Sequence, residues 1–163
     1  MIVNAYYKAL AMMAIGANID VPSVGGNSYN AYFNYNSSQK IFQFYNSLKA
    51  LASNDTTSGV VVGSGTTPPT AQDYKLENQI TTVSGNVAYN TTQDADGVTI
   101  NSIITVTNTA DTDITIGEVG LYVNTSGNWT WMAERTVLET PVTIPAGGVG
   151  QVTYTIRMNY PTA

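Results

Sequence analysis

The distribution of apolar residues divides the chain into a helical first third and a strand-rich remainder. After Ser53, valine and threonine dominate and turn residues separate short runs, which favours β-strands. Residues 98–107 and 152–160 alternate apolar and polar positions, a pattern typical of strands with one buried face. Further strands are expected within "SGVVVGSG" and at 83–89, 114–123 and 129–138, followed by a turn in "TPVTIPAGGVG". The loop "TTPPTAQDYKLENQI" is expected to hold one helical turn near 74–78.

Strands of this spacing, joined by short turns and without helices between them, predict a mainly β chain. The architecture expected is an antiparallel β-sandwich of about six to eight strands, either Ig-like or jelly-roll-like. The predicted sandwich domain spans 37–163. An amphipathic helix at about 38–52 precedes the strands, because apolar residues there recur with helical spacing.

Residues 1–36 are predicted to form an N-terminal helical and extended arm that makes an assembly contact. Asn4 can cap a helix at about 5–15 that is apolar on almost every face, and such a helix is buried against its own domain or another subunit. Residues 17–36 are rich in Gly, Asn and Tyr and predict irregular structure, either an arm over a neighbour or a packed surface loop. The assembly-interface candidates are Tyr6, Tyr7, Leu10, Met13, Tyr29, Tyr32, Phe33 and Tyr35.

The strand "ITIGEVGLYV" changes parity in its middle. Ile114 and Ile116 lie on one parity and Val119 begins the other, so the strand requires a bulge, and glycines at 117 and 120 make one least costly there. Glu118 lies at this point in an apolar context. It is either a catalytic carboxylate or the partner of Arg135 in a structural ion pair. The ion pair is favoured, because charges near a core are usually paired.

Composition limits the chemistry that the chain can carry. The net charge of −5, the pI near 4.3 and the six scattered basic residues argue against binding nucleic acid. Without cysteine or histidine, thiolate and zinc sites and the Ser-His-Asp and Cys-His arrangements are excluded. No apolar run approaches the roughly 20 residues of a membrane span.

The remaining motifs favour turns over binding sites. "VGSGTTPPT" lacks the third glycine of a dinucleotide site and the lysine of a P-loop. "DADG" at 94–97 and "DTD" at 111–113 could donate oxygens to calcium, but Asp and Gly between strands usually form turns. A carboxylate-dependent hydrolase would need two facing acids, for which Glu118 and Glu134 are the candidates inside apolar strands. The sequence therefore predicts no catalytic, cofactor-binding or metal-binding residues.

Three segments follow one another in the chain: "NSLKALAS" running into "GVVVGSGTTPPTAQDYKLENQI", then "ITIGEVGLY", then "WMAERTVLETPVTIPAGGVGQVTYTIRMNYP". In this order they resemble a family of small structural proteins of tailed-bacteriophage virions. The resemblance covers about 46–161 and implies a place in a virion, as a tail, collar, fibre or head-decoration component. The family has no shared catalytic site, so the resemblance implies a building or docking role.

The expected function is therefore that of a non-enzymatic virion component that assembles as a homo-oligomer and docks onto other virion proteins. The low share of charged residues, 10%, agrees with a chain that works inside an assembly. The alternative is a receptor- or carbohydrate-binding tip module of a fibre. In that case Trp129, Trp131 and the loop "NTSGN" would contact a host-surface glycan.

Overall fold

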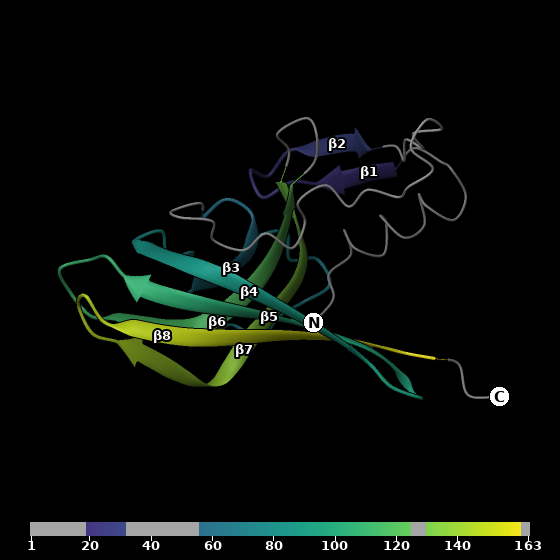
Figure 1. The fold of residues 1–163 in the computed structure, drawn as a ribbon. Coiled ribbons are helices and arrows are strands. Elements are labelled where there is room, and N and C mark those ends of the chain that lie inside the picture. The colour runs from purple at the N-terminus through teal and green to yellow at the C-terminus, as the bar shows by residue number, and fades with distance from the viewer. Residues whose placement is uncertain (1–18, 32–55, 125–129, 161–163) are drawn as a thin grey trace, which may run out of the picture.

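The computed structural model describes residues 19–31, 56–124 and 130–160, and the only regular secondary structure within these ranges is β-strand. The strands are β1 (Ile19–Pro22), β2 (Ser28–Ala31), β3 (Gly59–Gly63), β4 (Val83–Gln93), β5 (Gly97–Asn108), β6 (Ile114–Asn124), β7 (Thr130–Ile144) and β8 (Val149–Asn159). Strands β3, β6 and β7 form one antiparallel sheet, called here the β6 sheet. Strands β4, β5 and β8 form a second, the β5 sheet, and β1 pairs with β2. The predicted mainly β antiparallel sandwich is confirmed (Figure 1).

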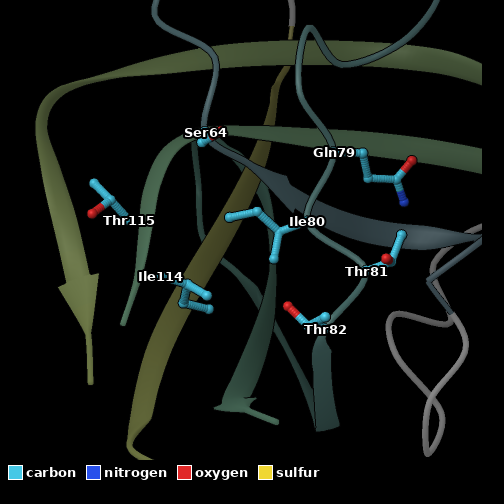
Figure 2. A pocket seen from close by; sticks show the side chains of 7 residues that line it. All are labelled: Ser64, Gln79, Ile80, Thr81, Thr82, Ile114 and Thr115. Atoms are coloured by element: carbon cyan, nitrogen blue, oxygen red, sulfur yellow. The ribbon is translucent and has the colours of Figure 1, made fainter. Parts of the chain in front are cut away.

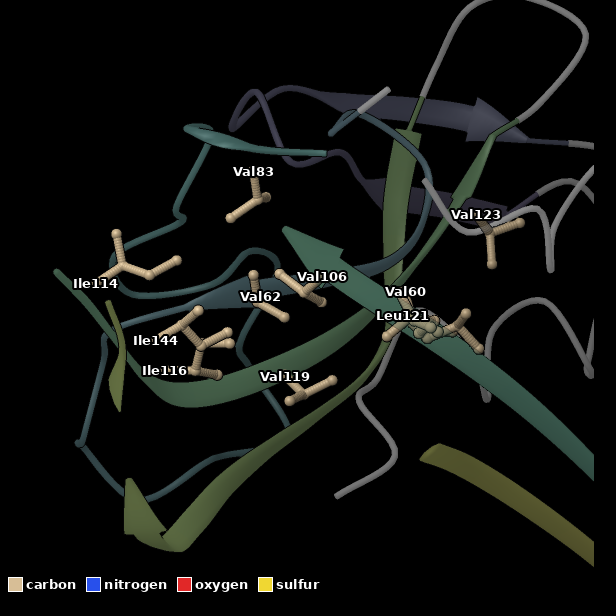
Figure 3. Close-up of a cluster of buried hydrophobic side chains, with 12 residues drawn as sticks. Val60, Val62, Val83, Val106, Ile114, Ile116, Val119, Leu121, Val123 and Ile144 are labelled. Atoms are coloured by element: carbon tan, nitrogen blue, oxygen red, sulfur yellow. The ribbon is translucent and has the colours of Figure 1, made fainter. Parts of the chain in front are cut away.

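The main hydrophobic core lies between the two larger sheets. Val60, Val119 and Leu121 enter it from the β6 sheet, and Val106 enters it from the β5 sheet (Figure 3). Ile104 of β5 belongs to the same cluster. The inner positions of β8 pack against the edge of this core. Burial of these aliphatic side chains is the main force that holds the sheets together.

The opposite face of the β6 sheet is also covered. A second cluster joins Val61, Tyr122 and Met132 of this sheet to Leu76, which belongs to the loop between β3 and β4. Val21 of the β1–β2 hairpin completes the cluster. The β6 sheet is therefore the middle layer of the described structure, and β3 is buried along its whole length.

Among the described residues, in contrast, the β5 sheet is covered on one face. Along β8 the odd-numbered positions are exposed and the even-numbered positions are partly buried as far as Ile156. Beyond Ile156, Met158 and Tyr160 are 52% and 42% exposed. Figure 1 shows β8 and the tip of the β4–β5 hairpin extending past the remaining strands at the lower right.

The predicted irregularity of β6 near Gly117 is present, although the extra residues lie on its partner β7. The register between β6 and β7 shifts between Ile116 and Glu118, and again between Leu121 and Tyr122. On β7, Val142 pairs with Ile116 while Val137 pairs with Glu118, so residues 138–141 have no counterpart in the ladder except Gly117. Proline is tolerated within 138–141 because no ladder hydrogen bond is required there.

Three local predictions are wrong. Strand β7 does not end near 138 but continues to Ile144, because its last residues pair with the start of β6, and the turn is confined to 145–148. No helical turn forms near 74–78; side-chain hydrogen bonds hold that loop in a bent, irregular path. Residues 19–31, within the segment expected to be irregular, form the β1–β2 hairpin.

The hairpin contacts its own sandwich. The backbone N–H of Val24 donates to the carbonyl of Thr130 at 2.9 Å, and Val21 is buried in the second cluster. Tyr29 lies in β2, where its backbone is opposite Val21. The predicted helices at 5–15 and 38–52 lie outside the described residues. So do the interface candidates Tyr6, Tyr7, Leu10, Met13, Tyr32, Phe33 and Tyr35.

Candidate functional site

Glu118 lies at the centre of a buried charged cluster under the loop 64–79. Its side chain is 0% exposed, and its two oxygens accept hydrogen bonds from four N–H groups. Oε1 accepts from the backbone N–H groups of Gly65 at 3.1 Å and Asn78 at 2.8 Å. Oε2 accepts from the backbone of Glu77 at 3.2 Å and from Nε of Arg135 at 2.7 Å. The predicted partners Glu118 and Arg135 are thus in direct contact.

Arg135 joins this carboxylate to the loop. Arg135 is 3% exposed, and its Nη1 donates to Oδ2 of Asp73 at 2.7 Å. Nη2 lies 3.4 Å from Oε2 of Glu77, so one arginine faces three carboxylates. Burial alone would lower the pKa of Arg135, but hydrogen bonds to Asp73 and Glu118 outweigh it and raise that pKa. The arginine is therefore held in its charged form.

The two loop carboxylates also fix the loop's own backbone. Glu77 accepts from the backbone N–H groups of Thr66 and Thr67 and from the hydroxyl of Thr67, which lowers its pKa. Burial would raise the pKa of Asp73, but hydrogen bonds from Thr70 and Arg135 lower it overall. Each of these carboxylates is stabilised in its ionised form by donors of the same loop and by the same arginine.

Tyr122 provides a further fixed point for this loop. Its hydroxyl accepts a hydrogen bond from the backbone N–H of Leu76 at 2.8 Å, and the residue is 2% exposed. Burial raises the pKa of Tyr122 to about 12. The phenol is therefore neutral over the physiological range and serves as an acceptor.

Glycines allow the loop to approach the β6 sheet this closely. A Cβ at Gly63 would lie 2.5 Å from Oε1 of Glu118, and a Cβ at Gly65 would lie 2.6 Å from the same atom. A Cβ at Gly120 would lie 2.8 Å from Cδ2 of Leu76. Since real Cβ contacts are longer than this, any side chain at these positions would displace the loop. The pattern "VGSG" followed later by "GEVG" is thus explained by contact distance.

The cluster is suited to holding structure together. A general acid or base must reach a substrate proton, directly or through one water molecule. Glu118 is fully buried, and the donors that surround it occupy both of its oxygens. The arrangement therefore ties a loop and two strands together and offers no surface to a substrate.

Other residues considered from the sequence are placed elsewhere. Glu134 accepts a hydrogen bond from the hydroxyl of Tyr154 at 2.9 Å, which links the two sheets. Trp131 is partly buried and packs against both hydrophobic clusters, whereas Trp129 and most of "NTSGN" lie outside the described residues. Asp94 accepts from the backbone N–H groups of Asp96 and Gly97 and forms a tight turn. Asp113 accepts from the backbone of Ala146.

An open groove lies at the side of the sandwich near the start of β6. Its volume is about 370 Å³, and it is lined by Ser64, Gln79, Ile80, Thr81, Thr82, Ile114 and Thr115 (Figure 2). These side chains are neutral, and Figure 2 shows the threonines spread around the groove without converging on one point. The groove does not contain the charged cluster.

Sequence reasoning missed Asp73, Glu77 and Asn108. Asn108 is 1% exposed, and its Nδ2 donates to the carbonyls of Thr112, Ile144 and Pro145. The spacing of Asp73 and Glu77 carries no signal, because acids in a Pro- and Thr-rich loop are typical of exposed turns. Only the tertiary structure brings them to Arg135.

Within 19–31, 56–124 and 130–160, acidic residues do not gather in a group of three that could hold a metal ion. The same ranges contain no helix that is long and apolar enough to cross a membrane. Comparisons with protein-family models, curated proteins and solved structures find no match.

Proposed function

We propose that the chain is a non-enzymatic structural component of a tailed-bacteriophage virion, which assembles with copies of itself and docks onto other particle proteins. The observation that carries this proposal is the convergence of the three segments that resemble that family. Gly65, Asp73 and Glu77 come from the first segment, Glu118 from the second and Arg135 from the third. Segments that are separate in the sequence meet in one cluster.

This convergence supports a building role. Residues of the three segments bind one another and position a loop, and their polar atoms are directed into the cluster. These residues are needed to form the fold. A family of particle proteins without a shared active site would have residues of this structural kind in common.

The exposed face of the β5 sheet also suits assembly. Its β8 positions carry Gln151, Thr153 and Thr155, and Arg157 is paired with Asp94 at 2.9 Å. Neutral polar faces of this kind form protein contacts without large costs of desolvating charges. Tail, collar and head decoration are all compatible locations.

The alternative of a glycan-binding fibre tip receives less support. It relies on exposed aromatic faces, and Trp131 is engaged with both hydrophobic clusters. A platform for sugar stacking would need that ring to be open to solvent.

The test is the composition of purified particles. Phage particles from a culture that produces this chain, purified by density gradient, should contain it in a fixed ratio to the major capsid protein. Quantitative mass spectrometry measures this ratio. Portal or tail genes should adjoin its reading frame. Absence of the chain from the particles, together with a neighbourhood that lacks phage genes, would refute the proposal.

A further inference from the structure

Strand β8 forms a long edge of the β5 sheet. All of its residues, Val149–Asn159, pair with β5 on one side without a register shift. In the strand order β4–β5–β8, the described residues contribute no strand on its other side.

The backbone groups on the outer side of β8 can be identified from the hydrogen bonds that flank the strand. The N–H of Asn108 donates to Gly148 and the N–H of Tyr160 donates to Asp96, so even-numbered residues of this strand exchange bonds with β5. The odd-numbered residues then direct their N–H and C=O groups away from the sheet. They are Val149, Gln151, Thr153, Thr155, Arg157 and Asn159. No backbone hydrogen bond joins these six outward positions to another part of the described chain.

The usual protections against edge pairing are missing from β8. Natural edge strands are kept from pairing by proline, lysine, bulges, inward charges or short length. This strand is 11 residues long, "VGQVTYTIRMN", with a single charge at Arg157. That charge is already matched by Asp94 of the same chain, with Nη2 to Oδ1 at 2.9 Å.

The inner face of β8 favours extension of the sheet. Val152, Tyr154 and Ile156 pack against the main core, so an added strand with the same alternation would continue that apolar layer. The opposite edge, β4, differs in this respect. Its residues 90–93 are exposed on both parities, so a strand added there would not join a covered face.

We propose that β8 of one copy pairs antiparallel with β8 of a second copy about a twofold axis, which joins two β5 sheets into one six-stranded sheet. The outward backbone groups belong to odd positions in both copies, so odd positions must lie opposite odd positions. Even positions then also face one another, and the apolar inner faces and polar outer faces both match. The twofold places the two Arg157 side chains on opposite sides of the axis, each beside its own Asp94.

This pairing names a self-contact for the assembly described under the proposed function, and it rests on that proposal for its biological setting. The edge geometry itself does not depend on the phage resemblance. The two ideas therefore fail separately: particle composition tests the first, and the number of copies in solution tests the second.

Two proline variants of the full chain test the pairing. Thr153→Pro removes an outward N–H of β8 and leaves its bonds to β5 in place, and Thr91→Pro does the same on β4. Sedimentation equilibrium at micromolar concentration should give an even number of copies for the wild type. Thr153→Pro should halve that number, and Thr91→Pro should preserve it. A monomeric wild type, an unchanged Thr153→Pro assembly, or equal halving by Thr91→Pro would overturn the inference.

A cross-linking experiment covers the case in which Thr153→Pro fails to fold. The chain has no cysteine, so variants with one cysteine at Gln151, Thr153 or Thr155 can be oxidised without background, alone and as equimolar mixtures of two. In a twofold pair only the residue on the axis lies opposite itself, so the mixtures cover the registers in which an odd position lies opposite a different odd position. Opposed residues of an antiparallel pair are close enough for a disulfide. At least one variant or mixture should yield a covalent dimer, while Thr91→Cys should yield none. No dimer from any β8 variant or mixture, or equal yield from Thr91→Cys, would overturn the pairing.

Discussion

The β6 sheet and the β5 sheet are both three-stranded and antiparallel, but they are stabilised in different ways. The β6 sheet is covered on both faces, and its strand β3 is a continuous buried run, "GVVVG". The β5 sheet is covered on one face, and β8 shows simple alternation. Continuous apolar runs and alternating runs in the sequence thus correspond to middle and outer layers.

The difference extends to polar residues. The middle layer includes an ionised cluster, and glycines let the covering loop approach it. The outer layer places its Arg157–Asp94 pair in solvent. Removing one partner of a buried charge network lowers the free energy of unfolding strongly, whereas an exposed ion pair contributes little to it. This comparison leads to four predictions, given from the largest expected effect to the smallest.

Removal of the central cation should have the largest effect. Arg135→Met leaves Glu118 buried without a counter-charge and frees Asp73 from the sheet, so we expect the unfolding free energy to fall by about 3–5 kcal/mol. Urea denaturation followed by tryptophan fluorescence measures this loss. Arg157→Met removes the arginine of the outer sheet and is the matched control, with a much smaller expected change. Equal losses in the two variants would show that the two ion pairs are equivalent.

A single methyl group at the loop contact should have the next largest effect. Gly63→Ala places a Cβ 2.5 Å from Oε1 of Glu118 and 2.7 Å from the carbonyl of Asn78. Overpacking of this kind should lower the unfolding free energy by about 2–3 kcal/mol. Gly25→Ala is the control, because its nearest neighbour, Oγ of Ser23, lies at 3.6 Å. Thermal unfolding of both variants tests this, and similar melting temperatures would contradict it.

The buried phenol of Tyr122 should make the free energy of unfolding depend on pH in the alkaline range. Tyr122→Phe removes the acceptor for the Leu76 N–H and should cost about 1–2 kcal/mol at neutral pH. The folded pKa of Tyr122, about 12, lies above the ordinary value of 10. The unfolded chain therefore loses this proton first, and stability falls as the pH rises from 10 towards 12.

The variant should show a shallower decline over that interval. Urea midpoints measured at several pH values between 9 and 12 provide the comparison with the wild type. Parallel curves for the two proteins would mean that Tyr122 ionises equally in the folded and unfolded states.

The smallest effect is expected for the exposed pair. Hydrogen bonds from Arg157 and from the backbone of Asp96 lower the pKa of Asp94 from 3.8 to about 2. A lowered carboxyl pKa stabilises the fold above pH 4, and this contribution is lost as the pH falls towards 2. Asp94→Asn should therefore change the melting temperature slightly at pH 7, and about 1 M salt should remove most of the difference. A large effect that resists salt would contradict the contrast between the sheets.

The sequence was informative where local pattern and tertiary environment agree. Alternation in 98–107 and in 152–160 correctly predicted β5 and β8, and the parity change around Gly117 correctly predicted the irregular register of β6. The contact between Glu118 and Arg135 followed from the cost of burying a lone charge. In each case the need to bury apolar side chains or to pair a buried charge left few alternative structures.

Elements that depend on tertiary packing could not be predicted. The β1–β2 hairpin has four-residue strands in a Gly- and Asn-rich segment, and it is stabilised by Val21 and Val24 on the β6 sheet. The last part of β7 contains Pro141, which reads as a turn signal, yet the strand continues because it pairs with β6. Asp73 and Glu77 resemble ordinary turn residues until Arg135 is placed beneath them.

The buried cluster also has a consequence for folding kinetics. The N–H donors that Glu118 gathers from the loop lie 53, 41 and 40 residues away in the sequence, and Asp73 lies 62 residues from Arg135. Contacts this distant form late, after neighbouring strands such as β6 and β7 have paired. Interactions that are absent from the transition state act mainly on the unfolding rate. We therefore expect the cluster to set how long the folded chain lasts, with little influence on how quickly it first forms.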